Sequence, residues 1–352
     1  MNDDNSAGTH GPFRVRLKGS GTEFEVLGGE SVLDAALRQG IVLPYSCRTG
    51  TCATCKGRLI SGEVDYGEYQ EQALTAAERD QGYALLCQAQ PRSDLEVEAR
   101  EVAVAEEIEI KLLPCRVTAM TPISHDVMEL RVQLPQNQRF HYLPGQYIDL
   151  LMRDGRRRSF SIANPPAEEG VLELHVRRVP DGYFTNYIFD GMKVRDLLRF
   201  EGPLGTFFLR DGDERRPLIF VAGGTGFAPI KAILEHAFDE GVSRPMHFFW
   251  GVRGERDLYM RELVESWQQR YDRFSFTPVL SEPGGEDQWN GDTGWVHDVV
   301  TQYHPDLSGY QVYASGPPPM IEALKKSFPE HGLPAEQLFY DSFEFSYDTP
   351  AS

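Results

Sequence analysis

Four cysteines stand at a spacing that predicts an iron–sulfur site. Cys47, Cys52 and Cys55 form the pattern C-x4-C-x2-C, and Cys87 follows after a long gap. This is the plant-type [2Fe–2S] spacing, in which four thiolates hold two irons and two bridging sulfides. The residues between them are mostly small, so the backbone can curl around a cluster and direct N–H groups at sulfur. Structural zinc, the alternative, usually takes two separated C-x2-C pairs, and this sequence has one.

The fifth cysteine, Cys115, lies outside that pattern in a segment where apolar residues alternate with polar ones. Free cysteine behaves as a small hydrophobic residue when it is buried. We therefore expect Cys115 to be part of a core and not a ligand.

A run of arginines and hydroxyls is compatible with a dinucleotide pyrophosphate site. Residues 156–164 place the sequence Arg158-Ser159-Phe160-Ser161 on a probable strand. Downstream, Gly182 and Thr185 stand at the apparent start of a short helix, where free N–H groups and the helix dipole favour a phosphate. Residues 201–207 look like a turn followed by an aromatic edge. An arginine cluster alone is more often a solvated face, so the prediction depends on this context.

Two glycine-containing junctions predict a second nucleotide site. Residues 218–222 form a probable buried strand, and Gly223, Gly224, Thr225 and Gly226 follow it as a tight loop before a helix start with Pro229. Residues 314–320, which include Ser315, Gly316 and Met320, also end a strand and open a helix. Ligands of open parallel sheets bind at the carboxyl ends of the strands. An ordinary strand–helix turn remains the alternative, because the loop is not the G-x-G-x-x-G fingerprint.

The segments around the cysteines predict a small α+β domain. Apolar residues alternate over 13–17 and 23–27, which indicates a hairpin of half-buried strands. Ser31 stands three residues before Asp34 at the head of an apolar helical pattern that Gly40 closes, as in a capped helix. Further strands are expected at 56–61, 84–87 and 95–99.

The rest of the chain divides into two patterns. Short alternating segments punctuated by proline and glycine predict an antiparallel barrel, with strands at 115–121, 127–133, 147–152, 159–163 and 172–178. From Arg216 onward, apolar runs at 218–222, 246–250, 274–280 and 310–314 alternate with helical patterns at 228–238, 259–271 and 319–328. Such alternation predicts a parallel sheet covered on both faces.

Length and charge exclude several classes of protein. The 352 residues suit two or three domains of roughly 100–150 residues each. The net charge of −18 repels nucleic acid and anionic lipid, and no apolar run approaches the roughly 18 residues of a membrane span. Because the first residues lack the features of a signal peptide, we expect a cytoplasmic protein.

These motifs, in this order, resemble the ferredoxin–NAD(P)H reductase superfamily in the version with an N-terminal plant-type ferredoxin domain. Reductase components of bacterial oxygenases and the CDP-6-deoxy-delta-3,4-glucoseen reductases have this layout. The resemblance implies a β-grasp ferredoxin-type domain at 12–101, an FAD-binding barrel at 111–212 and an NAD(P)-binding α/β domain at 213–346. A disordered tail at 1–11, a linker at 102–110 and a tail at 347–352 complete the expected organisation.

The resemblance also implies roles for single residues. Arg158 would meet the FAD pyrophosphate, with Ser159 and Phe160 beside it, and Ser161 would lie near flavin N5. Gly182 and Thr185 would support the phosphates. The nicotinamide dinucleotide would lie against Gly223, Gly224, Thr225 and Gly226, with Ser315, Gly316 and Met320 opposite. Phe343 would cover the flavin face that nicotinamide must reach. The family commonly has tyrosine at Phe160 and cysteine at Ser315, so this chain lacks one hydroxyl and one thiol of the pattern.

The implied activity is electron transfer from NADH through FAD and the cluster to a partner protein. The partner would be an oxygenase component or a pyridoxamine-dependent dehydrase, and a redox-responsive binding protein with slow turnover is the alternative function. Glu255 and Asp257 would oppose the 2′-phosphate of NADPH, whereas Arg253 or Arg256 could meet it. Between Glu63 and Glu109, 13 residues are acidic and 3 are basic, which predicts a basic docking patch on the partner or else a merely solvated face.

Overall fold

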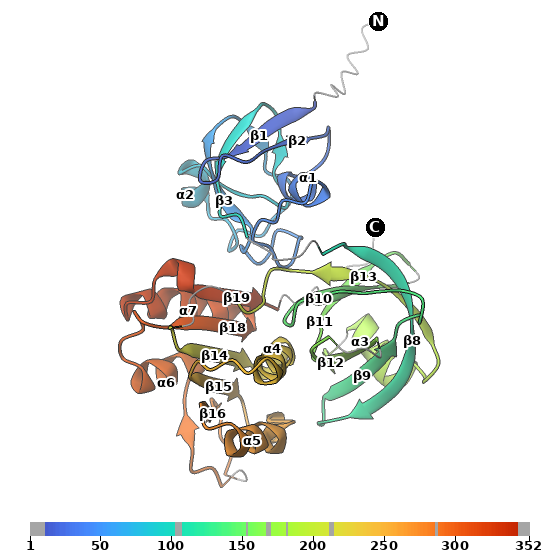
Figure 1. Cartoon of the computed structure of the whole chain (residues 1–352), viewed down its shortest axis with the longest axis vertical. Helices are drawn as coiled ribbons and strands as arrows, with labels where there is room; N and C mark the ends of the chain where they lie inside the picture. The colour runs from blue at the N-terminus through green and yellow to red at the C-terminus, as the bar shows by residue number, and fades with distance from the viewer. Residues whose placement is uncertain are drawn as a thin grey trace, which may run out of the picture. The chain divides into compact units, whose positions relative to one another are not determined.

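The computed structural model describes residues 11–102, 108–152, 154–166, 170–180, 182–210, 215–285 and 288–343. The chain forms two compact units, which divide between Glu107 and Ile108 (Figure 1). Residues 1–10 and 347–352 of the predicted tails, and 103–107 of the predicted linker, lie outside the described ranges. No helix within those ranges has both the length and the apolar composition needed to cross a bilayer.

The N-terminal unit is the α+β domain that the cysteine-bearing region predicts. Its five-stranded sheet has the order β2-β1-β7-β3-β5, with β1 antiparallel to β2 and parallel to β7. Ser31 caps the first helix and accepts a hydrogen bond from the Asp34 amide at 3.1 Å. The elements are β1 (Phe13–Leu17), β2 (Glu23–Val26), α1 (Val32–Arg38), β3 (Lys56–Ser61), β4 (Val64–Asp65), α2 (Ala76–Asp80), β5 (Tyr83–Leu85), β6 (Gln90–Pro91) and β7 (Leu95–Glu98).

The first half of the second unit, residues 108–210, is the predicted antiparallel barrel, and we call it the barrel half. Its six strands have the order β11-β10-β13-β8-β9-β12, and a bridge between Ile162 and Leu174 joins the two ends. The strands enclose an apolar core that includes Cys115, and burial raises the pKa of this thiol to about 12. The elements are β8 (Lys111–Pro122), β9 (Val127–Gln133), β10 (Tyr147–Leu151), β11 (Arg157–Ser161), β12 (Val171–Arg177), α3 (Tyr183–Asp190) and β13 (Leu197–Leu204).

One local expectation in the barrel half is wrong. Residues 201–204, predicted as part of a turn, complete β13 and pair with β8 and β10. Gly202 is needed there for space, because a Cβ on it would lie 2.8 Å from Ile148 Cγ2. The turn begins at Gly205, whose φ is +89°.

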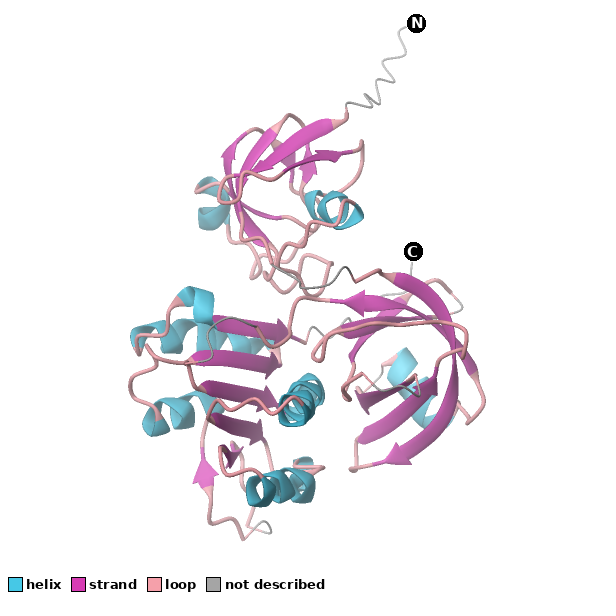
Figure 2. Cartoon of the chain, viewed as in Figure 1, coloured by secondary structure: helices cyan, strands magenta, loops and turns pink. Residues whose placement is uncertain are grey.

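The second half of this unit, residues 215–343, is the predicted parallel sheet, and we call it the nucleotide half. The order is β17-β16-β15-β14-β18-β19, every pairing is parallel, and helices cover both faces (Figure 2). Alternate residues of β14 enter opposite cores, Phe220 toward α4 and Val221 toward α6 and α7. The strands are β14 (Leu218–Gly223), β15 (Met246–Val252), β16 (Phe274–Leu280), β17 (Asp292–Thr293), β18 (Gln311–Gly316) and β19 (Leu338–Ser342). The helices are α4 (Phe227–Asp239), α5 (Arg261–Arg270), α6 (Val296–Tyr303) and α7 (Pro318–Glu330), with 3-10 turns η1 (Gly224–Gly226), η2 (Glu255–Asp257) and η3 (Ala335–Gln337).

Candidate functional site

The four cysteines of the sequence pattern come together in the N-terminal unit. Cys47, Cys52 and Cys55 lie on the loop before β3, and Cys87 follows β5. The Cys47 and Cys52 side chains lie within hydrogen-bond reach of each other, and so do those of Cys55 and Cys87. The ligand set is therefore arranged as two pairs.

This arrangement favours a dinuclear cluster over zinc. A tetrahedral zinc ion needs every sulfur about 2.3 Å away, which brings the sulfurs within about 4 Å of one another. Across the described ranges, three ligand atoms lie within 4.8 Å of one another only at His125, Asp126 and Asp257, so no three of the cysteine sulfurs approach that closely. Two pairs of thiolates, in contrast, suit the two irons of a [2Fe–2S] cluster.

Backbone amides of the cysteine loop point at sulfur. The N–H groups of Thr49 and Thr51 donate to Cys47 Sγ at 3.4 and 3.5 Å, and the Cys47 N–H donates to Cys52 Sγ at 3.4 Å. The pKa of Cys47 is lowered to about 4, because hydrogen bonds from Cys52 and then from Thr51 and Thr49 outweigh its burial. The loop thus stabilises the thiolate of Cys47, the form that binds iron, whereas hydrogen bonds with Cys47 and Cys87 and then burial raise the pKa of Cys52 and Cys55 respectively.

The curl of this loop depends on left-handed backbone conformations. Gly50 has a φ of +76°, and a Cβ on it would lie 2.7 Å from the Glu68 carbonyl oxygen. Arg48 and Ala53 also have positive φ, at 59° and 62°. Each such non-glycine residue costs roughly 1–2 kcal/mol, which the surrounding structure must offset. The tight, amide-lined loop fits a cluster of the predicted kind.

The arginine and hydroxyl motif lies on β11, with its side chains on alternate faces of the strand. Arg158 and Phe160 share one face, and the Phe160 ring centroid is 5.9 Å from that of Phe184 on α3. On the other face, Ser159 Oγ donates to Asp149 Oδ1 at 2.6 Å. The motif is therefore anchored through Ser159 on one face and through the packing of Phe160 on the other.

Charge at the start of β11 favours an anion. Burial and then the neighbouring Arg156 lower the pKa of Arg158, so a nearby phosphate would stabilise its charged form. The Arg156 guanidinium lies 4.8 Å from the ring centroid of Tyr183, the first residue of α3. The arginine run and the α3 N-terminus thus lie at one place on the barrel half.

Gly182 and Thr185 both lie at the start of α3, as predicted. Gly182 is the N-cap, and a Cβ there would lie 2.7 Å from Thr185 Oγ1. The Thr185 hydroxyl accepts a hydrogen bond from the Val179 N–H at 3.1 Å. Thr185 therefore shapes the turn before the helix in this structure, and its contact with a phosphate stays a prediction.

The two glycine junctions of the nucleotide half pack directly against each other. A Cβ on Gly226 would lie 2.0 Å from the Ser315 carbonyl oxygen, and one on Gly223 would lie 2.7 Å from Met320 Sδ. Gly316 would bring a Cβ to 2.9 Å from the Gly223 nitrogen. Only glycine permits this approach, which places both loops at the carboxyl ends of adjacent strands β14 and β18.

Three further residues at this place bear on ligand binding. Ser315 is fully buried, and its hydroxyl has no hydrogen-bond partner within the described residues. Thr225 is half-buried in η1. The Phe343 N–H donates to the Gly316 carbonyl at 2.9 Å, so the predicted covering aromatic is anchored beside the loop. The residues present fit a nicotinamide dinucleotide.

Sequence reasoning missed a polar contact between the barrel half and the nucleotide half. Glu173 and His175 of β12 and Lys231 of α4 are 5–6% exposed. Lys231 Nζ lies 3.2 Å from Glu173 Oε1, and His175 Nδ1 lies 3.1 Å from the Tyr259 hydroxyl. The one signal in the sequence was a lysine inside the apolar helical run 227–234.

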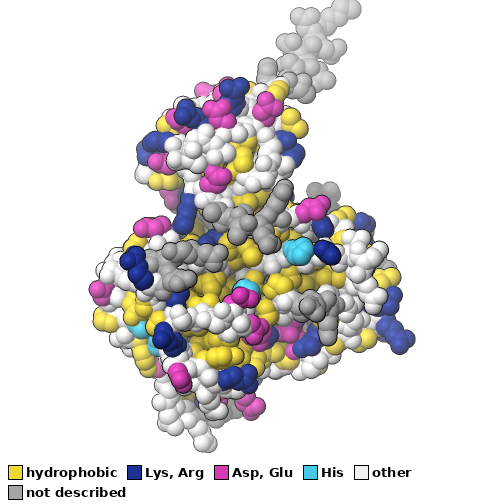
Figure 3. Space-filling view, in the orientation of Figure 1, with side chains coloured by type: hydrophobic (Ala, Val, Ile, Leu, Met, Phe, Trp, Pro, Cys, Tyr) yellow, Lys and Arg dark blue, Asp and Glu magenta, His cyan; other side chains and the backbone are white. Residues whose placement is uncertain are grey.

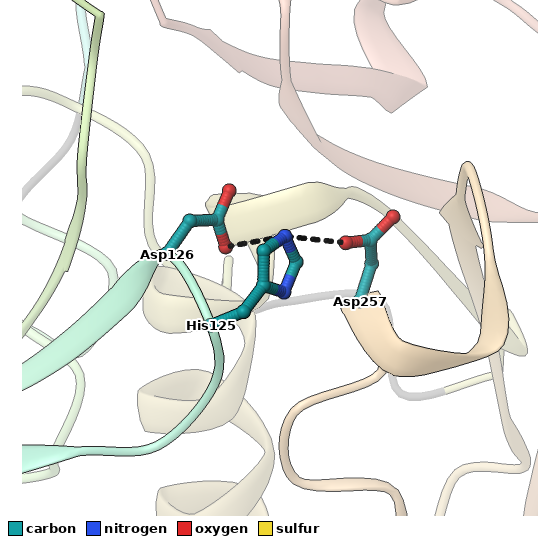
Figure 4. A group of neighbouring side chains, drawn as sticks. All are labelled: His125, Asp126 and Asp257. Carbon is teal, nitrogen blue, oxygen red and sulfur yellow. Dashed lines mark ion pairs between the residues drawn. The ribbon is translucent and has the colours of Figure 1, made fainter.

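A second group spans the same two halves. His125 and Asp126, before β9, face Asp257 of η2, and His125 Nε2 lies 3.8 and 3.7 Å from their carboxylate oxygens (Figure 4). Arg177 of β12 contacts the same carboxylates, at 2.7 Å from Asp126 and 3.7 Å from Asp257. A Cβ on Gly224 would lie 2.7 Å from the Arg177 guanidinium. Because the Arg177 guanidinium already contacts both carboxylates, we interpret the group as an ion-pair network.

Comparisons with known proteins agree with this division of the chain. A 2Fe-2S iron-sulfur cluster binding domain matches residues 15–92, an oxidoreductase FAD-binding domain matches 114–209, and an oxidoreductase NAD-binding domain matches 220–326. These matches confirm the predicted fold classes and the set of cofactor classes.

Relatives match over nearly the whole chain. A CDP-6-deoxy-L-threo-D-glycero-4-hexulose-3-dehydrase reductase of Yersinia pestis is 40% identical over 94% of this chain and 98% of its own. The reductase component of a phenol 2-monooxygenase from Pseudomonas sp. is 36% identical over 96% of both. A crystal structure of an Amycolatopsis cytochrome P450 reductase superposes with a TM-score of 0.78 at 34% identity, covering 94% of this chain and 98% of that one.

Proposed function

The chain belongs to the iron–sulfur flavoprotein reductases of the ferredoxin–NAD(P)H reductase superfamily, and from this premise we propose that it passes electrons from NADH through FAD and a [2Fe–2S] cluster to a partner protein. It is an NAD(P)H oxidoreductase. The observation that carries the proposal is the presence in one chain of a paired cysteine loop, an anion-favouring β11 and a glycine-lined junction beside a buried hydroxyl.

We assign the residues of the second unit as follows. When bound, nicotinamide supplies a hydride, FAD converts the electron pair to single electrons, and the cluster carries them one at a time. Arg158 and the amides after Gly182 would hold the FAD pyrophosphate, with Thr185 supporting that turn. Phe160 and Ser161, on the same strand, would line the isoalloxazine, with the Ser161 hydroxyl available as a hydrogen-bonding group.

The nucleotide half would bind and orient the hydride donor. The loop Gly223, Gly224, Thr225 and Gly226 presents backbone to the dinucleotide, as the close approaches of its glycines require. Ser315 offers its buried hydroxyl, and Gly316 and Met320 close the opposite side. Phe343, whose N–H is held by the Gly316 carbonyl, would cover the flavin face and shield it from water.

The N-terminal unit would deliver electrons. Cys47, Cys52, Cys55 and Cys87 are the proposed iron ligands, supported by the two-pair arrangement and the amides directed at sulfur. These ligands need a reducing compartment to stay free of disulfides, which supports a cytoplasmic location.

We propose an electron acceptor of the kind the relatives' names indicate: an oxygenase component or a pyridoxamine-dependent CDP-deoxysugar dehydrase. Beside the cysteine loop, a surface hollow of about 520 Å³ is lined by Tyr69, Glu71, Arg79, Asp80 and two apolar residues. Glu68 and Glu71 are exposed and have no ion-pair partner within the described residues. Acidic and basic side chains are interspersed on the visible face of this unit (Figure 3), so the docking charge would be local to this acidic hollow.

The proposal of NADH over NADPH rests on Glu255. The Asp257 carboxylate, the other predicted discriminator, accepts from the Gly254 N–H at 3.1 Å and faces His125 and Arg177. Glu255 pairs with Arg261 at 2.6 Å, on the loop after β15 where an adenine ribose would lie. Because Arg261 is shared between Glu255 and Glu265, a 2′-phosphate there would meet a group with a net negative charge.

We propose domain boundaries at 12–101, 111–212 and 213–346. Each matched family segment falls inside one of these ranges, and the division of the chain at 107 and 108 falls inside the proposed linker 102–110. Limited proteolysis of the whole protein tests these boundaries and is expected to cut first within 102–110. A first cut inside 15–92 would contradict them.

An anaerobic NADH titration followed by absorbance tests the function. Rapid bleaching of both the flavin and the cluster bands is expected. A spectrum that stays oxidised under excess NADH and NADPH would refute the reductase and favour a slow redox-responsive binding protein. Metal analysis tests the cysteine site separately. Zinc without acid-labile sulfide would mean that the cysteine site cannot pass electrons to the partner.

A further inference from the structure

Alternate residues of β12 form a polar row that faces the nucleotide half. Glu173, His175 and Arg177 lie on one face of the strand because side chains alternate along it. Glu173 contacts Lys231, His175 contacts Tyr259, and Arg177 contacts Asp257. One strand of the barrel half therefore reaches two separate segments of the nucleotide half, helix α4 and the segment 257–259.

Lys231 is the centre of this contact. Its Nζ donates to the Ala163 carbonyl at 3.1 Å and to Glu235 Oε2 at 2.9 Å, and it lies 3.2 Å from Glu173 Oε1. His175 Nε2 lies 2.9 Å from the same Glu173 oxygen, and Arg131 lies 3.3 Å from the other oxygen, Oε2. Every proton of the buried ammonium thus has an acceptor, which is the condition for burying a lysine.

The partners of Lys231 lie at the two places where the cofactors would be held. Ala163 is two residues beyond Ser161, and its N–H donates to the Glu173 carbonyl at 2.8 Å, so β11 and β12 are fastened together there. Lys231 itself is in the second turn of α4, directly after the loop Gly223–Gly226. A single side chain therefore connects the end of the flavin strand to the helix that carries the nucleotide loop.

A buried polar contact of this kind specifies geometry more than it adds stability. Apolar side chains of the same volume often give an equally stable interface, whereas hydrogen bonds fix distance and direction. Hydride transfer requires the reacting atoms to approach to about 3–3.5 Å, and a displacement of about 1 Å can slow a reaction by about 100-fold. The position of α4 relative to β11 controls that approach.

We propose that Glu173, His175, Lys231 and Tyr259, here called the domain joint, set the separation between the flavin strand and the nucleotide loop, with Lys231 as the positioning residue. The inference rests on the proposed function. The joint acts on the rate of hydride transfer more than on nucleotide affinity, because its side chains lie outside the two glycine junctions and the Tyr259 hydroxyl, although on the segment after η2, is engaged by His175.

The test compares Lys231→Met with the control Glu235→Gln in the full-length, cofactor-loaded protein. The methionine keeps the length of the side chain and removes all contacts to the barrel half, whereas Glu235→Gln changes only the partner on α4 itself. Lys231→Met is expected to slow flavin reduction at saturating NADH by about 10- to 100-fold, with the Kd of NAD⁺ changed by less than about twofold. Glu235→Gln is expected to match the wild type.

Amide hydrogen exchange gives a readout independent of turnover. In the oxidised protein without nucleotide, Lys231→Met is expected to exchange faster over 160–166 and 224–235, and Glu235→Gln is expected to exchange like the wild type. If Lys231→Met lowers the melting temperature but leaves flavin reduction and this exchange unchanged, the joint is only structural and the proposal is wrong. Equal defects in both variants would also overturn it.

A milder variant covers the case in which Lys231→Met does not retain FAD. Tyr259→Phe removes one hydroxyl from His175 and keeps the ring packed against Phe227 and Trp250. It is expected to slow flavin reduction several-fold at an unchanged melting temperature, and an unchanged rate would contradict the joint. Failure of NADH to reduce the wild-type flavin is a separate outcome, which would refute the proposed function while the exchange comparison still tests the joint.

Discussion

At the scale of single residues, Ser315 buries a hydroxyl without a hydrogen-bond partner in the described structure. An unmade hydrogen bond on a buried hydroxyl costs roughly 1–3 kcal/mol, so Ser315→Ala is expected to raise the free energy of unfolding by about 1 kcal/mol in the absence of nucleotide. Calorimetry of the FAD-loaded protein measures this, and saturating NAD⁺ is expected to reduce the gain if the hydroxyl binds nucleotide. A less stable Ser315→Ala protein would contradict the prediction.

Cys87 offers a second prediction at this scale. Cys87→Ser is expected to abolish electron delivery to a protein acceptor and to spare NADH-driven reduction of small dyes, because dyes accept directly from flavin while the acceptor needs the cluster. The measurement is the ratio of the two activities together with iron content. Cys115→Ala is the matched control and is expected to keep both, because Cys115 lies in the barrel core. Equal loss of both activities in Cys87→Ser would refute this division of labour.

Residues differ in how far the sequence reveals them. The cysteine set could be predicted because its spacing is itself the signal, and the glycine loops because glycine permits backbone approach that other residues do not. The contact between Glu173 and Lys231 could not be predicted, because in the sequence each looks like an ordinary strand or helix residue. Only folding brings Lys231 Nζ to 3.2 Å from Glu173 Oε1. Alternation along 172–178 predicted the strand, found at Val171–Arg177, but not that its polar face would be covered.

At the scale of elements, β15, β16 and α6 meet at a histidine pair. His247 Nδ1 lies 2.9 Å from His304 Nε2, and His247 Nε2 lies 2.9 Å from Thr277 Oγ1. Burial, and then the charge of His304, lower the pKa of His247 to about 4 from its usual 6.5. Because the folded pKa is depressed, the neutral form stabilises the fold above about pH 6.5, and that stability is lost as the pH falls toward 4.

This loss predicts an acid-sensitive nucleotide half. The full shift corresponds to at most about 3 kcal/mol. His247→Gln is expected to flatten the fall in melting temperature between pH 6.5 and 4, whereas the control substitution of the exposed His141, His141→Gln, is expected to leave it as in the wild type. An identical pH profile for His247→Gln and the wild type would count against the histidine pair.

Elements were predictable where their periodicity is strong. The strands Val127–Gln133 and Phe274–Leu280 begin and end where alternation and an apolar run place them. Helix α6 (Val296–Tyr303) was missed, since its eight residues give only two turns of pattern and its burial depends on β15, where Gly251 leaves room for Val296. Strand β19 was also missed, because its formation depends on pairing with β18.

At the scale of the whole molecule, charge has a measurable consequence. If the acidic hollow docks a basic partner, the apparent KM for the acceptor protein is expected to rise several-fold between about 0.05 and 0.5 M salt, since exposed charges are screened over that range. Glu68→Gln with Glu71→Gln is expected to reduce this salt dependence, and Glu330→Gln on α7 serves as the control. Acceptor reduction that does not change with salt would argue for a merely solvated face.

The contact between Gly226 and Ser315 also has a genetic consequence. Every missense change at codon 226 would place a Cβ 2.0 Å from the Ser315 carbonyl oxygen. To relieve that clash, the paired strands β14 and β18 would have to separate. A Cβ built on Gly285 or on Gly309, in contrast, would have no heavy atom of the described residues within 4 Å. We therefore expect substitutions to accumulate at codons 285 and 309 during evolution. Codon 226 is expected to keep glycine whichever electron acceptor the protein serves.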